Sequence, residues 1–432
     1  MNKTLKENRE MKDSGIDWIG KIPKEWDVRK LSSKYTFHTG FTPDTKKTEF
    51  YDDEGFNWVT ISDLNKSKVI LDTQKKISEL GVAATKGTLT PKGSLLYSFK
   101  LSVGQVGIAG KDLYTNEAIA SFTPNQNECL NFLYYSSQVC IIQNANENIY
   151  GAKLLNQELI KSAKIVLPPL NEQQDIANYL DKQVGKIDEL IVEQNQAIEN
   201  WKNYKQSLIT ETVTKGLNPN VEMKDSGIEW IGEIPKAWEV RKLKSIGDTI
   251  IGLTYSPEDV TDNGVLVLRS SNVQNGKIVL SDNVFVNKEI KDKLITQVGD
   301  ILICSRNGSK SLIGKSALIT ESIAGNTFGA FMTVFRTKHY KFVYYALNSS
   351  IFSYYIGSFL TSTINQLTTE NLKNIKIALP SSIEQQQIVD FLDEKCSKID
   401  QTIEQKQVLI QQLEEYKQSL IYECVTGKRC VL

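Results

Sequence analysis

Two copies of one unit follow each other along this 432-residue chain, and no other feature limits its fold as strongly. Residues 11–31 (MKDSGIDWIGKIPKEWDVRKL) match residues 223–243 (MKDSGIEWIGEIPKAWEVRKL) at 17 of 21 positions. The offset between them is 223 − 11 = 212, and the same offset recurs in two further pairs. These pairs are LPPLNEQQDIANYLD at Leu167 with LPSSIEQQQIVDFLD at Leu379, and YKQSLITETVT at Tyr204 with YKQSLIYECVT at Tyr416. The chain is therefore two copies of one unit.

The closing segment of each copy predicts a long helix. Residues 172–213 contain no proline and one glycine, Gly185, and apolar residues recur there in steps of three and four. The stripe comprises Ile176, Leu180, Val184, Ile187, Ile191, Ile198, Trp201 and Leu208, and its counterpart Ile388, Leu392, Cys396, Ile399, Ile403, Ile410, Leu413 and Leu420. Pro168, Pro169 and Pro380 stand where the two helices would begin. At 1.5 Å per residue, each helix is roughly 60 Å long.

A helix of this length with a narrow apolar stripe needs a partner, and the helix of the other copy is the nearest one. We expect a pseudo-dimer within one chain, with antiparallel helices paired as an intramolecular coiled coil. Gln194 and Lys406, which are equivalent positions, interrupt the two stripes. They either fix the register of the pairing or mark a loose, partly exposed point. The expected seam positions are Leu180, Ile187, Ile191, Gln194, Ile198, Leu392, Ile399, Ile403, Lys406 and Ile410.

The repeat predicts an α+β fold, in which two tandem α/β-type recognition domains are separated by the two long antiparallel helices. The predicted boundaries follow the matched segments. They are a first recognition domain at 1–166, a helix and linker at 167–222, a second recognition domain at 223–378 and a second helix at 379–432.

Symmetry also predicts how the ends of the chain are placed. Met223–Gly232 follows the first helix through a short linker, whereas its twin, Met11–Gly20, has no helix before it in this sequence. The twin is therefore expected against Leu420–Thr426, at the end of the second helix, so that the fold closes in a circle. The apolar side chains Ile16, Trp18 and Ile19 would be buried there, and their packing on their own recognition domain is the alternative.

Between the matched segments, residues 32–166 and 244–378 share a skeleton but few surface residues. An apolar run at Gly93–Lys100 (GSLLYSFK) resembles Gly299–Arg306 (GDILICSR) and predicts a buried strand after a turn. Similar frames with different polar residues at strand ends are what two readers of different targets need, and drift of a duplicated scaffold is the other interpretation. Two further parallels are Trp58–Leu64 (WVTISDL) with Val267–Val273 (VLRSSNV), and Leu133-Tyr134-Tyr135 with Val343-Tyr344-Tyr345.

Polar side chains at these strand ends are the candidate contacts to nucleic acid, because their hydroxyl, amide and cationic groups suit phosphates and base edges. They are Thr60, Ser62 and Lys100 in the first copy, and Arg269, Ser271, Asn272, Arg306, Asn307, Ser309 and Lys310 in the second. A solvated surface turn is the alternative for each of them.

The second copy also contains a segment, GSKSLIGKS at Gly308–Ser316, that looks like a phosphate-binding loop. Five residues separate its two glycines, whereas the nucleotide-binding loop has four, and the extra residue disturbs the convergence of backbone N–H groups on a phosphate. We therefore interpret it as a polar loop at a strand end.

Composition excludes several classes of protein and favours none. Lysine plus arginine and aspartate plus glutamate both number 51, so a basic cleft could exist only opposite an acidic surface. With only His38 and His339, a histidine-rich metal centre is excluded, and the six scattered cysteines form no C-x-x-C pair. No apolar stretch approaches eighteen residues or so, and Met1–Glu10 has no apolar signal core, so we expect a cytoplasmic protein without a membrane partner.

No sequence motif supports catalysis. The chain contains no G-x-G-x-x-G fingerprint, no G-x-S-x-G elbow, no H-E-x-x-H helix and no N-P-P-Y sequence of amino methyltransferases. A self-contained enzyme with a coiled-coil arm would be expected to show such a cluster.

The repeat, the helices and the variable segments together resemble the specificity subunits of type I restriction–modification systems, from about residue 11 to the end. The most specific motif is D-S-G-I-x-W-I-G-x-I-P-x-x-W, at Asp13–Trp26 and again at Asp225–Trp238. G-D-I-L-I-x-x-R-x-G at Gly299–Gly308 matches the core of the family's recognition domain, and its counterpart at Gly93 lacks the aspartate and the arginine. The other matches are L-P-x-x-x-E-Q-Q at Leu167–Gln174 and Leu379–Gln386, and Y-K-Q-S-L-I at Tyr204–Ile209 and Tyr416–Ile421.

The resemblance implies a non-catalytic subunit that reads a bipartite site in double-stranded DNA, with one half-site per recognition domain. It also implies that the paired helices dock two DNA-adenine methyltransferase subunits and, in the full assembly, restriction subunits that translocate DNA. No cofactor is expected in this chain, because the partners would supply S-adenosylmethionine, ATP and magnesium and would flip the target adenine. The alternative function is a coiled-coil adaptor that binds proteins without specific DNA binding.

Overall fold

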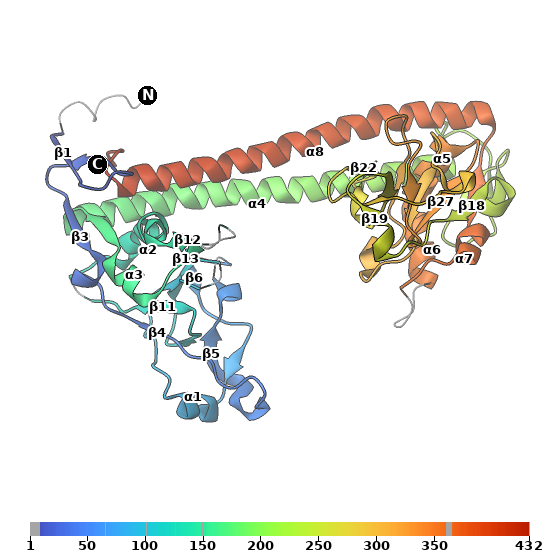
Figure 1. Cartoon of the computed structure of the whole chain (residues 1–432). Helices are drawn as coiled ribbons and strands as arrows, with labels where there is room; N and C mark the ends of the chain where they lie inside the picture. The colour runs from blue at the N-terminus through green and yellow to red at the C-terminus, as the bar shows by residue number, and fades with distance from the viewer. Residues whose placement is uncertain are drawn as a thin grey trace. The chain divides into compact units, whose positions relative to one another are not determined.

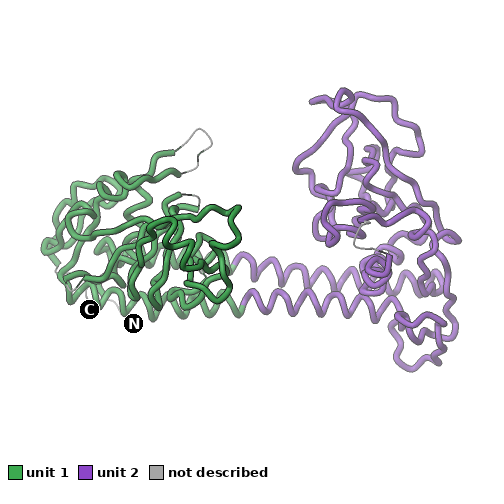
Figure 2. Tube along the Cα trace, turned by 90° about the horizontal axis from the view of Figure 1, so that it is seen from below, with its two compact units in different colours: residues 1–193, 409–432 green, residues 194–408 purple. Residues whose placement is uncertain are grey.

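The computed structural model describes residues 9–64, 66–100, 102–125, 127–147, 151, 153–359 and 365–431. The chain divides into two compact units (Figure 2). Unit 1 comprises residues 1–193 and 409–432, and unit 2 comprises residues 194–408. Unit 1 is thus assembled from both ends of the sequence. The four-segment division predicted from the sequence stays a prediction.

Two long helices dominate the fold, as the apolar stripes predict (Figure 1). Helix α4 spans Leu170–Lys215 with 46 residues, and helix α8 spans Ser382–Val425 with 44 residues. Helix α4 begins directly after Pro169, and α8 begins two residues after Pro380. With a rise of 1.5 Å per residue, each is between roughly 65 and 70 Å long.

Ion pairs show that α4 and α8 pair in an antiparallel sense. In unit 1 the Lys417 ammonium lies 2.6 Å from the Asp188 carboxylate, and in unit 2 Lys205 lies 2.6 Å from Asp400. The two pairs are equivalent under the 212-residue repeat. A step forward along α4 from Asp188 to Lys205 thus accompanies a step backward along α8 from Lys417 to Asp400. The expected antiparallel pairing is confirmed.

Gln194 and Lys406 contact each other at the middle of the seam. The Lys406 Nζ donates a hydrogen bond of 2.9 Å to the Gln194 Oε1, and both side chains are half-buried. Because the helices are antiparallel, equivalent positions of the two copies can contact each other only at the midpoint of the pairing. The contact between Gln194 and Lys406 therefore marks that midpoint. Both interpretations of these residues hold in part, because the polar pair is ordered and also partly exposed.

Burial along the seam varies with what covers it. The outer positions Leu180 and Leu392 are fully buried, since elements of units 1 and 2 respectively pack over them. Nearer the middle, two helices alone cannot enclose a side chain on all sides. Ile187, Ile198 and Ile399 are still buried there, whereas Ile191, Ile403 and Ile410 are half-buried.

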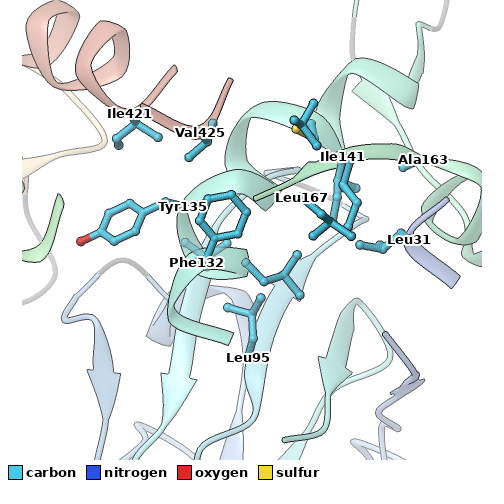
Figure 3. Close-up of a cluster of buried hydrophobic side chains, with 14 of the residues drawn as sticks. Leu31, Leu95, Phe132, Tyr135, Ile141, Ala163, Leu167, Ile421 and Val425 are labelled. Atoms are coloured by element: carbon cyan, nitrogen blue, oxygen red, sulfur yellow. The ribbon is translucent and has the colours of Figure 1, made fainter. Parts of the chain in front are cut away.

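The recognition part of unit 1 is a five-stranded sheet in the order β4-β11-β8-β9-β6, antiparallel except for the parallel pair β9 and β6. Helix α2 (Leu130–Cys140) packs Phe132 and Tyr135 into the same core as Leu95 of the sheet and Ile421 and Val425 of α8 (Figure 3). The strands of this sheet are β4 (Phe37–Thr39), β6 (Val69–Ile70), β8 (Leu95–Ser98), β9 (Val106–Ala109) and β11 (Ile119–Phe122).

Smaller elements complete unit 1. A three-stranded sheet has the order β10-β5-β7, and three strand pairs join β1 to β2, β3 to β14 and β12 to β13. Their bounds are β1 (Met11–Asp13), β2 (Lys21–Pro23), β3 (Asp27–Lys30), β5 (Tyr51–Val59), β7 (Lys76–Ile77), β10 (Tyr114–Thr115), β12 (Asn146–Glu147), β13 (Lys153–Leu154) and β14 (Lys164–Leu167), with helices α1 (Glu79–Thr85) and α3 (Gln157–Ser162).

Unit 2 contains two four-stranded sheets, in the orders β18-β27-β24-β25 and β19-β23-β20-β26. Their strands are β18 (Asp248–Ile251), β19 (Val260–Thr261), β20 (Val265–Leu268), β23 (Phe285–Val286), β24 (Ile301–Cys304), β25 (Ser316–Leu318), β26 (Thr327–Phe328) and β27 (Met332–Arg336). The remaining elements are β15 (Met223–Asp225), β16 (Glu233–Pro235), β17 (Glu239–Lys242), β21 (Val273–Gln274), β22 (Lys277–Ile278), β28 (Lys376–Leu379), α5 (Tyr340–Leu347), α6 (Ser350–Phe359) and α7 (Thr369–Asn374).

Strands β8 and β24 are the buried strands that the apolar runs predict. Ile301 and Ile303 of β24 enter the core beside the helices of unit 2, while Leu302 and Cys304 enter the core between its sheets. A strand buried on both faces has no polar face, which explains the unbroken apolar run. Before each strand stands a glycine, Gly93 or Gly299, with a φ of +85° or +88° that side-chain-bearing residues rarely adopt.

The repeat also conserves the bonds that hold each recognition part on its helix. The Tyr135 hydroxyl donates to Asp181 of α4 at 2.6 Å, and the Tyr345 hydroxyl donates to Asp393 of α8 at 2.5 Å. Burial and then the hydrogen-bonded carboxylate raise the pKa of both tyrosines above the ordinary value. The parallel between the two Tyr-Tyr segments is thus a structural one.

The ends of the described chain close on each other within unit 1, as symmetry predicts. Ile16 and Ile19 are buried in one core with Leu420, Ile421, Cys424 and Val425, and Trp18 is half-buried against it. The Tyr422 hydroxyl donates a hydrogen bond of 3.0 Å to the Trp18 carbonyl. The expected contact between Met11–Gly20 and Leu420–Thr426 is confirmed.

This closure predicts that the chain tolerates circular permutation. A variant in which residue 431 is joined to residue 9 by a flexible linker, with new ends inside 217–222, keeps every contact just described. We expect its helix content by circular dichroism to equal that of the original, with a melting temperature within a few degrees. New ends placed at Gln194, inside α4, serve as a control and should abolish cooperative unfolding. If the permutant with ends inside 217–222 loses cooperative unfolding as the control does, the closure does not hold unit 1 together.

Candidate nucleic-acid interface

Two loops of unit 2 meet at the ends of strands β20 and β24. The first is the turn Arg269–Asn272 after β20, and the second is the loop 305–315 after β24. The Asn307 Nδ2 donates a hydrogen bond of 3.0 Å to the Ser270 Oγ, and the Lys315 Nζ donates one of 2.8 Å to the Val273 carbonyl. The structure therefore brings together the two groups of candidate residues that lie more than thirty positions apart in the sequence.

Asn272 holds the first loop from inside. It is fully buried, and its Oδ1 accepts a hydrogen bond of 2.9 Å from the Arg269 N–H. Its Nδ2 donates to the carbonyls of Val279 and Ser281 at 3.1 and 3.2 Å. No part of this side chain reaches the surface, so we do not retain Asn272 among the candidate DNA contacts.

Arg269 is half-buried and already paired. Its Nη2 donates to the backbone carbonyl and the carboxylate of Asp282, both at 2.7 Å, and Asp282 has a positive φ of 57°. The guanidinium therefore stabilises a turn of the same loop that Asn272 holds. Beside it, the Ser271 hydroxyl is buried and has no hydrogen-bond partner among the described residues.

Arg306 differs from Arg269 because its charged group is open to solvent. The side chain is exposed, and its guanidinium carbon lies 5.1 Å from the centre of the Phe331 ring. Among the ion pairs of the described residues, none involves Arg306. Ser309 and Lys310 are exposed in the same loop, and the Ser309 N–H donates to the Asn307 Oδ1 at 2.9 Å. This loop is thus the most donor-rich exposed part of the candidate site.

Unit 1 repeats the first turn with a carboxylate in place of the amide. Thr60 occupies the position of Arg269, and the buried Asp63 occupies that of Asn272, accepting 2.9 Å from the Thr60 N–H. Burial alone would raise the pKa of Asp63, but hydrogen bonds from Thr60, Gln74 and Lys66 outweigh it and lower the pKa below the ordinary value. Ser62 is exposed, and its hydroxyl lies 2.8 Å from that of Thr60.

Lys100 of unit 1 occupies the position of Arg306. The Phe99 N–H bonds the Ala118 carbonyl at 2.9 Å, just as the Ser305 N–H bonds the Phe331 carbonyl at 3.0 Å. Lys100 is exposed after β8, and no hydrogen bond within the described parts of the chain joins it to the Thr60–Asp63 turn. The structure therefore gathers the candidates in unit 2 more closely than those in unit 1.

Two features of the site were missed in the sequence. Phe331 was not singled out because it is 26 residues from Ser305, and only the pairing of β24 with β27 brings it under Arg306. The structural role of Asp63 could have been found, since Thr60-x-x-Asp63 has the spacing of a capping box.

Other chemistry finds little support in the structure. No group of three or more histidine, cysteine, aspartate or glutamate residues that could hold a metal ion occurs among the described residues. Lys315 of the GSKSLIGKS segment donates a hydrogen bond to the Val273 carbonyl. None of the helices described is both long and apolar enough to cross a membrane.

Comparison with known proteins identifies the family. Residues 23–200 and 235–415 match the type I restriction modification DNA specificity domain. The chain belongs to this family. Each matched range contains the recognition part of one copy of the repeat and most of its long helix.

Individual relatives of the family agree with this assignment. The MjaVIII specificity subunit of Methanocaldococcus jannaschii is 32% identical over 286 residues, which cover 64% of this chain and 65% of that protein. The putative MjaX specificity subunit of the same organism is 27% identical over 95% of both chains. The chain thus spans slightly less than two thirds of the first of these relatives and nearly all of the second.

The fold is also found in a solved structure. A chain from a study of complex assembly and conformational transition of the type I R-M system superposes with a TM-score of 0.70 at 16% identity. The match covers 94% of this chain and 99% of the other. The α+β fold with paired long helices is therefore shared with that chain.

Two polar residues of the Arg269–Asn272 turn, Ser271 and Asn272, should respond differently to truncation. Asn272→Ala leaves the Arg269 N–H and two carbonyls without partners, and each buried unpaired group costs about 1–3 kcal/mol. Ser271→Ala removes a hydroxyl with no bond among the described residues and should cost almost nothing. Hydrogen exchange should show faster exchange in residues 269–283 for Asn272→Ala alone. Equal protection in both variants would contradict the structural role of Asn272.

Proposed function

We propose that this chain reads a bipartite site in double-stranded DNA and directs DNA-adenine methyltransferase and restriction subunits to it, without catalysing a reaction itself. One observation carries the proposal. Both units hold a turn and a loop at the ends of equivalent strands on a shared scaffold, and the exposed polar side chains there differ between the units. Constant scaffolds with variable donors suit two readers of two different half-sites.

The hydrogen bonds that hold the frame are constant between the copies, whereas the exposed side chains at the strand ends differ. The buried tyrosines of the frame, Tyr135 and Tyr345, donate the same hydrogen bond to exposed aspartates of the long helices, Asp181 and Asp393, in both copies. At the surface, Lys100 is replaced by Arg306. Random divergence of a duplicated scaffold would be expected to change residues without regard to their exposure at strand ends. Domains that recognise different half-sites are expected to differ at the residues that contact DNA.

The paired helices provide the surface that we assign to the methyltransferase subunits. Tyr204 of α4 and Tyr416 of α8 are equivalent residues of the Y-K-Q-S-L-I motif and are 53% and 50% exposed. Other large apolar side chains on the helices, including Leu190 and Val408, are exposed as well. Two equivalent exposed tyrosines in identical motifs suit two copies of one partner. In this proposal the partners carry S-adenosylmethionine, ATP and magnesium.

The direct test is co-expression with a methyltransferase subunit, followed by mapping of methylated adenines. We expect a stable complex of one such chain with two methyltransferase subunits and a single methylated motif made of two half-sites and a non-specific spacer. A complex that forms but methylates no defined motif would favour the adaptor function instead.

Substitutions in the two units should affect different half-sites. Arg306→Ala should relax or weaken only the second half-site, by about 1–3 kcal/mol if the guanidinium contacts a base. Lys100→Ala should affect only the first. Methylation mapping of both variants beside the unaltered chain measures this. Loss at the same half-site in both variants would show that the units do not read independently.

Helix length should determine the length of the non-specific spacer. Four residues inserted beside Gln194 add roughly 6 Å to α4 and displace the apolar stripe by only about a tenth of a turn. A duplex rises 3.4 Å per base pair. We therefore expect unchanged half-sites and a spacer longer by one or two base pairs. The same four residues placed within 217–222, outside the helix, are the control. An unchanged spacer with full methylation would show that the helices do not set it.

A further inference from the structure

Of the exposed cationic side chains at the strand ends, Arg306 alone combines an open guanidinium with an aromatic support. Arg269 is paired with Asp282, and Lys100 carries an ammonium rather than a planar group. An arginine presents its donors in a rigid planar fork, whereas lysine is a point charge on a flexible stem. Arg306 is therefore the candidate best suited to a bidentate contact with a base edge.

Phe331 is fixed in place beneath Arg306. Its carbonyl accepts hydrogen bonds of 3.0 Å from both the Ser305 and the Arg306 N–H groups, and strand β27 begins at the next residue. Phe331 is 57% exposed. The Ser305 hydroxyl also donates to the Phe331 carbonyl at 3.0 Å. Three donors on one carbonyl hold the backbone that carries the ring.

The contact between these two side chains restricts the guanidinium. At 5.1 Å from the ring centre, the cation is attracted to the face of the ring. A guanidinium held over an aromatic face loses fewer rotamers when it binds, so that less conformational entropy opposes binding.

The equivalent position of unit 1 is arranged differently, because the Lys100 Nζ lies 5.8 Å from the centre of the neighbouring Phe99 ring. There Lys100 replaces Arg306 and Ala118 replaces Phe331, while the bond from the preceding residue is kept, from Phe99 to Ala118 as from Ser305 to Phe331. The scaffold thus does not require an aromatic residue at this point. Arg306 and Phe331 thus occur together in unit 2.

We propose that Arg306, held by Phe331, reads a guanine in the major groove of the second half-site, and that Phe331 is its positioning residue. The fork of an arginine matches the O6 and N7 acceptors of guanine, which is the base it contacts most often in specific complexes. The proposal rests on the proposed function and adds the base and the mode of contact. Lys310, exposed in the same loop without a supporting ring, is then assigned to the phosphate backbone.

The experiment compares substitutions in the complete chain bound to methyltransferase subunits. Methylation mapping first defines both half-sites, and binding is then measured on duplexes in which each guanine of the second half-site is replaced in turn by 7-deazaguanine. This base keeps its pairing and loses the N7 acceptor. For the unaltered chain we expect one such position to weaken binding about tenfold or more, which corresponds to about 1.4 kcal/mol.

Three variants separate the roles of the two residues. Arg306→Lys should abolish the effect of 7-deazaguanine at that position. Phe331→Ala should reduce discrimination there while leaving the first half-site intact, and Phe331→Tyr should restore it because the ring is restored. Phe56→Ala, which truncates an exposed phenylalanine of unit 1, is the matched control and should leave the second half-site unchanged.

Other results would overturn the proposal. A second half-site without guanine on either strand would do so, as would an Arg306→Lys variant that weakens all sequences equally with a smaller dependence on salt, which is the sign of a phosphate contact. Failure of Phe331→Tyr to restore discrimination would remove the positioning role. If the unaltered chain recognises no defined motif at all, the proposed function fails rather than this inference.

Discussion

The apolar seam between α4 and α8 is the contact on which both units depend. The core of unit 1 contains Leu180 of α4 together with Ile421 and Val425 of α8, and the core of unit 2 contains Ile209 of α4 together with Leu392 of α8. Each core thus needs one end of each helix. Neither copy of the repeat can therefore complete its core with its own helix alone. Each apolar side chain that the other helix adds to the core stabilises the fold by about 1.5–3 kcal/mol.

The sequence predicted most of this frame because duplication supplies a symmetry argument. The helix starts follow from prolines, the antiparallel pairing from the two stripes, and the contact of Ile16 and Ile19 with the end of α8 from the position of their twins. The graded burial of the seam did not follow from periodicity. Ile191 and Ile403 occupy seam positions and remain half-buried because a pair of helices cannot enclose its own middle.

The candidate site was harder to predict, because a polar residue at a strand end can hold a loop or face a ligand. Asn272 holds the loop and Arg306 faces solvent, yet both were chosen by the same rule. The contact with Phe331 depends on strand pairing across the sheet and has no local signal. The net charge did not predict the site either. Ion pairs such as that of Arg269 with Asp282 determine which cationic side chains are free to contact a ligand.

The central claim is that the frame is constant and that each copy carries its own exchangeable reader. A chimera tests it most directly, with residues 244–378 replaced by residues 32–166 so that both units carry the first reader. With methyltransferase subunits present, mapping of methylated adenines should show the first half-site recognised twice and the second half-site lost. Retention of the original second half-site in a folded chimera would contradict the claim, since sequence would then be read outside the variable segments.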